Sequence, residues 1–148
     1  MPDLRINFSS MQKAYLSPYL VFDGDCKQAM EFYHSCMGGN LKMQTFGEAP
    51  MPCPDHYKGK IMHASLENDS LSFMASDTQP GNPVAKGTNV HLSVAGTDET
   101  RLKEIFAKLS KGGKVTMPLA KQFWGDTFGM LTDTFGIHWM FNIAGEKS

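Results

Sequence analysis

Three histidines stand in segments that alternate between polar and apolar residues, as half-buried strands do. They are His63, His91 and His138, and Glu67 follows the first at an even spacing. An imidazole can transfer protons or bind a metal near neutral pH. Two interpretations remain open. Either two or three of these histidines, with Glu67, form such a site, or each is hydrogen-bonded on its own strand and they never meet.

Aromatic residues late in the chain suggest a second kind of chemistry. Phe123, Trp124 and Phe128 surround Asp126 in the sequence. In one interpretation Trp124 covers a bound ligand and Asp126 contacts a polar group of that ligand. In the other, Trp124 packs at an edge or in a dimer contact, where tryptophan is common. Both interpretations stay open at this point.

No motif of a known catalytic class is present. The sequence contains no P-loop, no G-x-S-x-G and no HExxH. It also lacks a glycine-rich strand-to-helix turn followed by an acidic residue, which a nucleotide-type cofactor would need. We therefore predict no cofactor and leave catalytic residues unknown.

Composition excludes several classes of partner. The formal net charge is −1 and no basic stripe occurs, which argues against nucleic acid. No apolar run approaches the ~20 residues of a membrane span. The three cysteines, an odd number without CxxC spacing, and an N-terminus without an apolar signal segment favour a cytoplasmic location.

The elements that must position these side chains occur in the same order twice. In the first half we expect strands at 16–22, 41–46, 61–66 and 71–75, with a helix at 26–37. In the second half we expect strands at 89–94, 114–117, 123–132 and 137–143, with a helix at 98–109. Each helix ends at a Gly-Gly pair, at Gly38-Gly39 and at Gly112-Gly113. The predicted fold is therefore α+β, with two βαβββ modules.

The predicted domain organisation follows from this repeat. A Pro- and Gly-rich segment, DTQPGNPVAKG, separates the two halves, and periodicity is weak at the start of the chain. We predict an N-terminal extension at 1–14 and a single domain at 15–148. Within that domain we expect module one at 15–76, a linker at 77–87 and module two at 88–144.

Three runs of residues resemble one protein family. They are PYLVFDGDCKQAMEFYHSCMGG, HASLENDSLSFMASD and WGDTFGMLTDTFGIHWMFN, in this order. Together with the two βαβββ units they resemble the vicinal oxygen chelate superfamily, which has the glyoxalase/bleomycin-resistance fold, and its PhnB-like branch in particular. The resemblance implies curved mixed sheets that form a cup-shaped cavity, and it implies a homodimer.

The same resemblance indicates where a divalent metal would bind in the superfamily's enzymes. The corresponding positions fall here at Ser17 or Pro18, near Ser72, at Asn89 and at Met140. Such residues are not a credible ligand set for a hard or borderline divalent ion. We therefore predict no metal at the standard site.

These observations lead to a predicted ligand site and two candidate functions. Strand alternation gives each sheet a polar face opposite its apolar helix-facing side. We predict that this cup wall binds an unidentified small molecule through His63, His91, Trp124 and Asp126. The alternative is a metal-dependent lyase, isomerase or dioxygenase that uses a non-standard site based on histidines.

Overall fold

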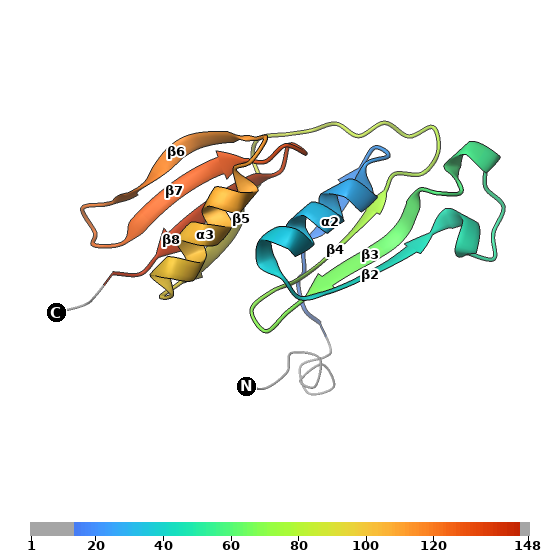
Figure 1. The fold of residues 1–148 in the computed structure, drawn as a ribbon. Coiled ribbons are helices and arrows are strands. Elements are labelled where there is room, and N and C mark those ends of the chain that lie inside the picture. Colours follow the sequence, from blue (N-terminus) through green and yellow to red (C-terminus); the bar gives the residue numbers. More distant parts are fainter. Residues whose placement is uncertain (1–13, 146–148) are drawn as a thin grey trace. The chain divides into compact units, whose positions relative to one another are not determined.

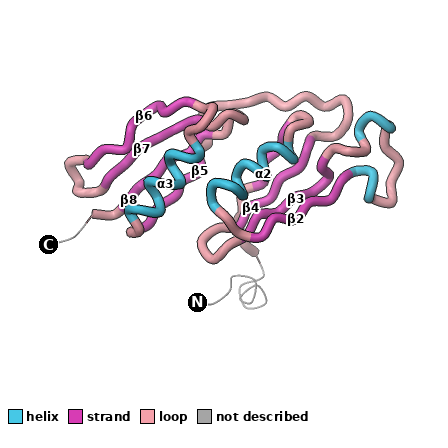
Figure 2. Tube along the Cα trace, viewed as in Figure 1, coloured by secondary structure: helices cyan, strands magenta, loops and turns pink. Residues whose placement is uncertain are grey.

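The computed structural model describes residues 14–145, so the predicted extension at 1–14 lies outside the described residues except for Ala14. The chain divides into two compact units, a first unit that ends at Val84 and a second that begins at Ala85. Each unit is a four-stranded mixed sheet with one helix on one face (Figures 1 and 2). In the described part of the chain, no helix is long and apolar enough to cross a membrane.

The first unit has its strands in the order β1-β4-β3-β2, with β1 parallel to β4 and the other pairs antiparallel. Two short 3₁₀ helices lie between β2 and β3. The elements are β1 (Tyr19–Phe22), α2 (Cys26–Met37), β2 (Asn40–Thr45), η1 (Phe46–Glu48), η2 (Asp55–Tyr57), β3 (Ile61–Glu67) and β4 (Ser72–Asp77).

The second unit repeats this topology in the order β5-β8-β7-β6, again with one parallel pair between its outer and next strand. Its elements are β5 (Leu92–Gly96), α3 (Glu99–Leu109), β6 (Lys114–Lys121), β7 (Thr127–Thr132) and β8 (His138–Ile143). The predicted α+β class and the two βαβββ modules are therefore confirmed.

Helix α2 forms where the sequence predicts it because its apolar residues recur on one side. On that side, the helix residues Ala29, Met30 and Tyr33 are fully buried. The helix ends at Gly38, whose φ of 73° is in the left-handed region that glycine favours. At its first turn, the N-cap residue Asp25 makes no side-chain hydrogen bond to the helix.

A buried carboxylate from another strand supports that first turn instead. Asp77 lies at the end of β4 and is 3% exposed. One of its oxygens accepts hydrogen bonds from the backbone N–H of Gly24 (2.8 Å) and of Cys26 (3.0 Å), and the other from Ile61 (2.8 Å). The sequence analysis placed Asp77 in the linker. Strand β4 extends this far because it lies between β1 and β3 and pairs with β1 up to Phe22.

Several strand boundaries in the second unit also differ from expectation. The segment expected as one strand at 123–132 is a turn followed by β7, because the Gly125 N–H donates to the Gln122 carbonyl and Gly125 has φ 99°. Strand β6 is longer than expected and continues past Pro118, which an edge strand tolerates. Strand β5 begins at Leu92, so His91 directly precedes it.

The core of the second unit lies between α3 and one face of its sheet. Phe106 of α3 and Phe141 of β8 pack edge to face, with ring centroids 5.3 Å apart. Trp139 of β8 is 3% exposed and belongs to the same core. Asp98 is the N-cap of α3, and its side chain accepts a hydrogen bond from the Arg101 N–H.

Candidate functional site

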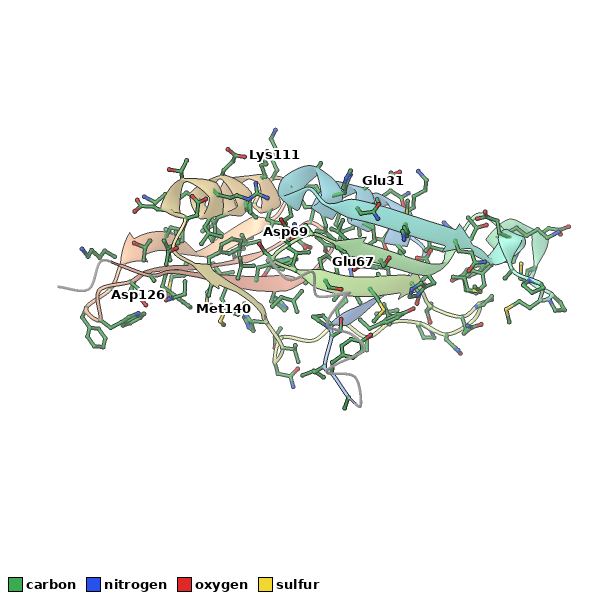
Figure 3. All side chains as sticks on the ribbon, turned by 90° about the horizontal axis from the view of Figure 1, so that it is seen from below. Glu31, Glu67, Asp69, Lys111, Asp126 and Met140 are labelled. Carbon is green, nitrogen blue, oxygen red and sulfur yellow. The ribbon has the colours of Figure 1, made fainter. Side chains whose placement is uncertain are left out.

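The face of the second sheet opposite α3, which we call the open face, carries the polar side chains of the alternating strands. Along β8, Trp139, Phe141 and Ile143 are buried, whereas the residues between them are half-buried. Figure 3 shows Met140 on the side of the sheet away from α3. The predicted polar face therefore exists in this unit.

Strand register arranges the open face in three rows that run across the sheet. Each row contains one residue from each strand, paired by the observed register or, for His91, by ring contact. The histidine row is His91, His138, Thr132 and Lys114; the methionine row is Ser93, Met140, Met130 and Met117; and the asparagine row is Ala95, Asn142, Phe128 and Ala120.

Two of the predicted histidines meet in the histidine row. The rings of His91 and His138 lie with their centroids 5.2 Å apart and their planes 32° apart. The sequence analysis left open whether any of the three histidines would meet. The parallel pairing of β5 with β8 brings these two together, although they are distant in the sequence.

Hydrogen bonds within the fold occupy both ring nitrogens of His138. Its Nε2 lies 2.8 Å from the carbonyl oxygen of Gly87, and its Nδ1 lies 2.8 Å from the hydroxyl of Thr132. Because a carbonyl can only accept, Nε2 carries the proton of that bond. His138 is thus held in place by the fold and has no free nitrogen for a metal.

The neighbouring His91 is in the opposite situation. Its Nδ1 is buried and has no hydrogen-bond partner among the described residues, although the residue as a whole is half-buried. A buried polar atom without a partner costs roughly 1–3 kcal/mol. Of the buried side-chain nitrogens and oxygens in residues 14–145, this is the one left without a partner.

The predicted residue Trp124 lies in the turn between β6 and β7, outside any strand. Trp124 is 46% exposed and packs edge to face against Phe123, which is 97% exposed. On its other side the Trp124 ring lies 6.2 Å from the ring of Phe128, which belongs to the asparagine row. Trp124 therefore stands at one end of the open face.

Asp126, in the same turn, accepts hydrogen bonds that stabilise the fold. One of its carboxylate oxygens accepts a hydrogen bond from the Asn142 side chain, and the other accepts one from the Gly145 N–H, each at 2.9 Å. These two bonds attach the β6–β7 turn to the end of β8. The role predicted for Asp126, as a polar contact to a ligand, stays a prediction.

His63 belongs to the first unit. It lies on β3, on the face opposite the buried Ala64 and Leu66, and is exposed. Its Nδ1 is 3.2 Å from the hydroxyl of Tyr19 on β1, and the two rings lie 5.9 Å apart. The prediction that His63 and His91 line one cavity concerns both units and stays a prediction.

The residues at the superfamily's standard metal positions do not fit a divalent ion. Ser17 directs its hydroxyl to the backbone carbonyl of Ser72 at 3.3 Å, Asn89 is exposed, and Met140 presents a thioether. Hard divalent ions prefer oxygen ligands such as carboxylates, and borderline ions such as Zn²⁺ are bound mostly by imidazole, thiolate or carboxylate. Within residues 14–145, no group of three or more His, Cys, Asp or Glu side chains is arranged to hold a metal.

The methionine row is a feature that the sequence analysis missed. Met117, Met130 and Met140 come from three adjacent strands and face the same side in the observed register. Their alternation with buried residues was visible in the sequence. Their alignment was not, because it depends on pairing between strands and on an irregularity in β6 after Val115.

Comparison with known proteins agrees with this architecture. Residues 15–141 match the Glyoxalase/Bleomycin resistance protein/Dioxygenase superfamily. The chain belongs to this superfamily. A similar protein, YjdN of Escherichia coli (strain K12), is 31% identical over 144 residues, which cover 89% of this chain and 97% of that protein.

Two solved structures are also similar to this superfamily member. Protein PA1353 from Pseudomonas aeruginosa is 39% identical, with a TM-score of 0.82 over 90% of this chain and 99% of that one. A PhnB protein from Bacillus cereus, described as a putative 3-demethylubiquinone-9 3-methyltransferase, is 24% identical, with a TM-score of 0.71 over 88% of this chain and 100% of that one. The predicted family is confirmed.

Proposed function

We propose that this protein binds a small molecule on the open face of its second sheet, without the superfamily's standard metal site. The unpartnered Nδ1 of His91 carries the proposal. The folded state would be more stable if this nitrogen had a partner or were absent, since an unsatisfied buried polar atom is costly. A ligand that forms a hydrogen bond with Nδ1 would remove that cost on binding.

The setting of His91 supports the same proposal. The ring is held against His138, which the fold fixes through Gly87 and Thr132. A ligand would therefore meet an imidazole that is already oriented, and it would lose less conformational entropy on binding. The half-buried side chains of the methionine row lie beside this point and present apolar surface to the same ligand.

The alternative, a metal-dependent lyase, isomerase or dioxygenase with a histidine-based site, has less support. Such a site needs about three protein ligands. His138 directs both nitrogens to protein oxygens, which leaves His91 as the free imidazole of this pair. The proposed site is therefore a binding surface, rather than a metal site, and His91 forms a hydrogen bond with the ligand.

A fragment screen by saturation-transfer NMR tests this proposal. We expect fragments that bind the wild-type protein and lose that binding in His91→Phe, which keeps a flat ring beside His138 but removes both nitrogens. His63→Phe, in the first unit, is the matched control and should keep those fragments. Fragments that bind His91→Phe as well as wild type would overturn the proposal.

A further inference from the structure

The centre of the open face is apolar and adaptable. Met130 pairs with Met140 on one side and with Met117 on the other, so three thioethers occupy neighbouring positions. Met130 and Met140 are half-buried, and Met117 is 41% exposed. They are thus not part of the core. Methionine side chains are flexible and polarizable, and they suit a surface that accommodates an apolar molecule.

One long side of this apolar strip is polar and basic. The histidine row contains the unpartnered Nδ1 of His91 and ends at Lys114, which is paired with Thr132 and exposed. No residue of the three rows carries a carboxylate. The nearest acidic group of the asparagine row, that of Asp126, accepts hydrogen bonds from Asn142 and from the Gly145 N–H. The ammonium of Lys114 therefore gives one end of the histidine row a positive charge.

The other long side contains one aromatic ring and has a second beside it. Phe128 lies in the asparagine row and Trp124 packs near it, with their ring centroids 6.2 Å apart. Neighbouring strands are about 4.8 Å apart and alternate residues of one strand about 7 Å apart. The three rows therefore cover a surface of roughly 10 to 15 Å in each direction, which is the size of a molecule with two fused or linked rings.

From this arrangement we infer that the ligand of the open face is a small amphipathic anion, with a flat apolar body on the methionine row, an acidic group at Lys114 and a hydrogen-bonding group at His91, at the opposite edge of the sheet. This inference rests on the proposed function and names the chemical class of its ligand. The acidic group is attracted to the ammonium of Lys114, and a polar group at the other end of the ligand forms a hydrogen bond with Nδ1 of His91. The apolar body gains contact with Met130 and Met140, and its far edge reaches the rings of Phe128 and Trp124.

Two fluorescent dyes with the same aromatic skeleton test this inference on the full chain. Anilinonaphthalene sulfonate carries a negative charge, and phenylnaphthylamine is the same molecule without the sulfonate. We expect the anionic dye to bind about threefold more tightly than the neutral one, because an exposed charge such as that of Lys114 contributes modestly. Equal affinity of the two dyes, or no saturable binding of the anionic dye, would overturn the inference.

Substitutions separate the two parts of the surface. Lys114→Gln should weaken the anionic dye about threefold and leave the neutral dye unchanged, because an exposed charge contributes modestly. The matched control is Lys111→Gln, since Figure 3 shows Lys111 on the α3 side of the sheet, away from Met140. An equal loss of the anionic dye in both variants, or in neither, would contradict a basic row at this position.

The methionine row is tested in the same way. Met130→Leu keeps the apolar surface and should keep both dyes, whereas Met130→Asn should weaken both. Met51→Asn changes a half-exposed methionine of the first unit and is the control. Unchanged binding in Met130→Asn would overturn the placement of the apolar body. Fragment binding that still depends on His91 would then retain the proposed function, so the two failures are distinguishable.

Discussion

The indole nitrogen of Trp139 donates a 2.9 Å hydrogen bond to the carboxylate of Asp133, and both side chains are only 3% exposed. The other oxygen of Asp133 accepts hydrogen bonds from the backbone N–H of Phe135 and of Ile137. In the first unit, Asp77 accepts three backbone N–H groups in the same manner. Each unit thus contains a buried carboxylate that accepts three hydrogen bonds from N–H groups of the same unit.

Removal of this carboxylate should strongly destabilise the second unit. Asp133→Ala leaves three buried or half-buried N–H groups without an acceptor, and we expect a loss of at least about 2 kcal/mol in the free energy of unfolding. Urea unfolding followed by Trp fluorescence measures it. Asp98→Ala, which removes only the exposed cap of α3, should cost about 1 kcal/mol. Equal losses in the two variants would contradict the central role of Asp133.

His91 and His138 should respond to the same substitution in opposite directions. His91→Phe removes a nitrogen that has no partner among the described residues, so we expect stability that is equal to wild type or higher by about 1 kcal/mol. His138→Phe loses the hydrogen bonds to Gly87 and Thr132 and should be less stable by roughly 1–3 kcal/mol. Thermal unfolding decides this, and a stability loss in His91→Phe would show that the fold itself needs the ring nitrogen.

The second glycine of each Gly-Gly pair is required by close packing of the backbone. A Cβ at Gly113 would lie 2.3 Å from the carbonyl oxygen of Thr132, and one at Gly39 would lie 2.6 Å from that of Glu67. Gly113→Ala should therefore lower the melting temperature by several degrees. Gly59→Ala is the matched control, because a Cβ there meets no described atom within 4 Å and its φ is not positive. Similar melting temperatures for the two variants would contradict this reading.

The cysteines should differ in reactivity. Burial, and secondarily the charges of Asp77 and Asp25, raise the pKa of the Cys26 thiol to about 12, so it stays protonated at neutral pH. Iodoacetamide at pH 8 should modify Cys53, which is half-buried, before Cys26 or Cys36, which are both buried. Peptide mass spectrometry gives the order, and early labelling of Cys26 would contradict its burial.

The raised pKa of Cys26 also predicts a pH dependence of stability. The thiol ionises in the unfolded chain near its ordinary value of 9.0 but in the folded chain only near 12. The folded state keeps its proton over this range, so stability is complete below pH 9 and is lost as the pH rises toward 12. Cys26→Ala should lose less stability than wild type between these two pH values, as measured by urea unfolding at each pH.

The homodimer implied by the family stays a prediction. Sedimentation equilibrium at micromolar concentration should give twice the mass of the 16.4 kDa chain, and a monomer would contradict it. Phe123 and Trp124 present exposed aromatic surface at the β6–β7 turn. Phe123→Ser should leave the stability of the chain within about 0.5 kcal/mol of wild type. A change to monomer in this variant would favour the dimer-contact interpretation of Trp124, and an unchanged dimer would favour the ligand-cover interpretation.

Much of the fold could be predicted because its signals are local. The residues of α2 and α3 bury one face at helical spacing, and this pattern needs no information from the rest of the chain. The boundaries of the strands were less predictable. Residues 123–132 were predicted as one strand, yet β7 begins only at Thr127, since the length of a strand depends on how far its neighbours continue to pair with it.

The candidate site could likewise be predicted only in part. Alternation in the sequence placed His91, His138 and Met140 on the polar side of their strands, and the structure agrees. The resemblance to the superfamily also placed standard metal positions at Asn89 and Met140, whose side chains do not suit a divalent ion. These properties need only the types of residues and the two-residue period of a strand.

Only the tertiary structure decided which of these side chains meet and which are already in use. The parallel pairing of β5 with β8 brings His91 onto His138, and the register of β6, β7 and β8 aligns three methionines. Hydrogen bonds from distant segments occupy His138 and Asp126 but leave Nδ1 of His91 without a partner in the described chain. Register and bulges are set by contacts between segments far apart in sequence, so a local pattern carries no record of them.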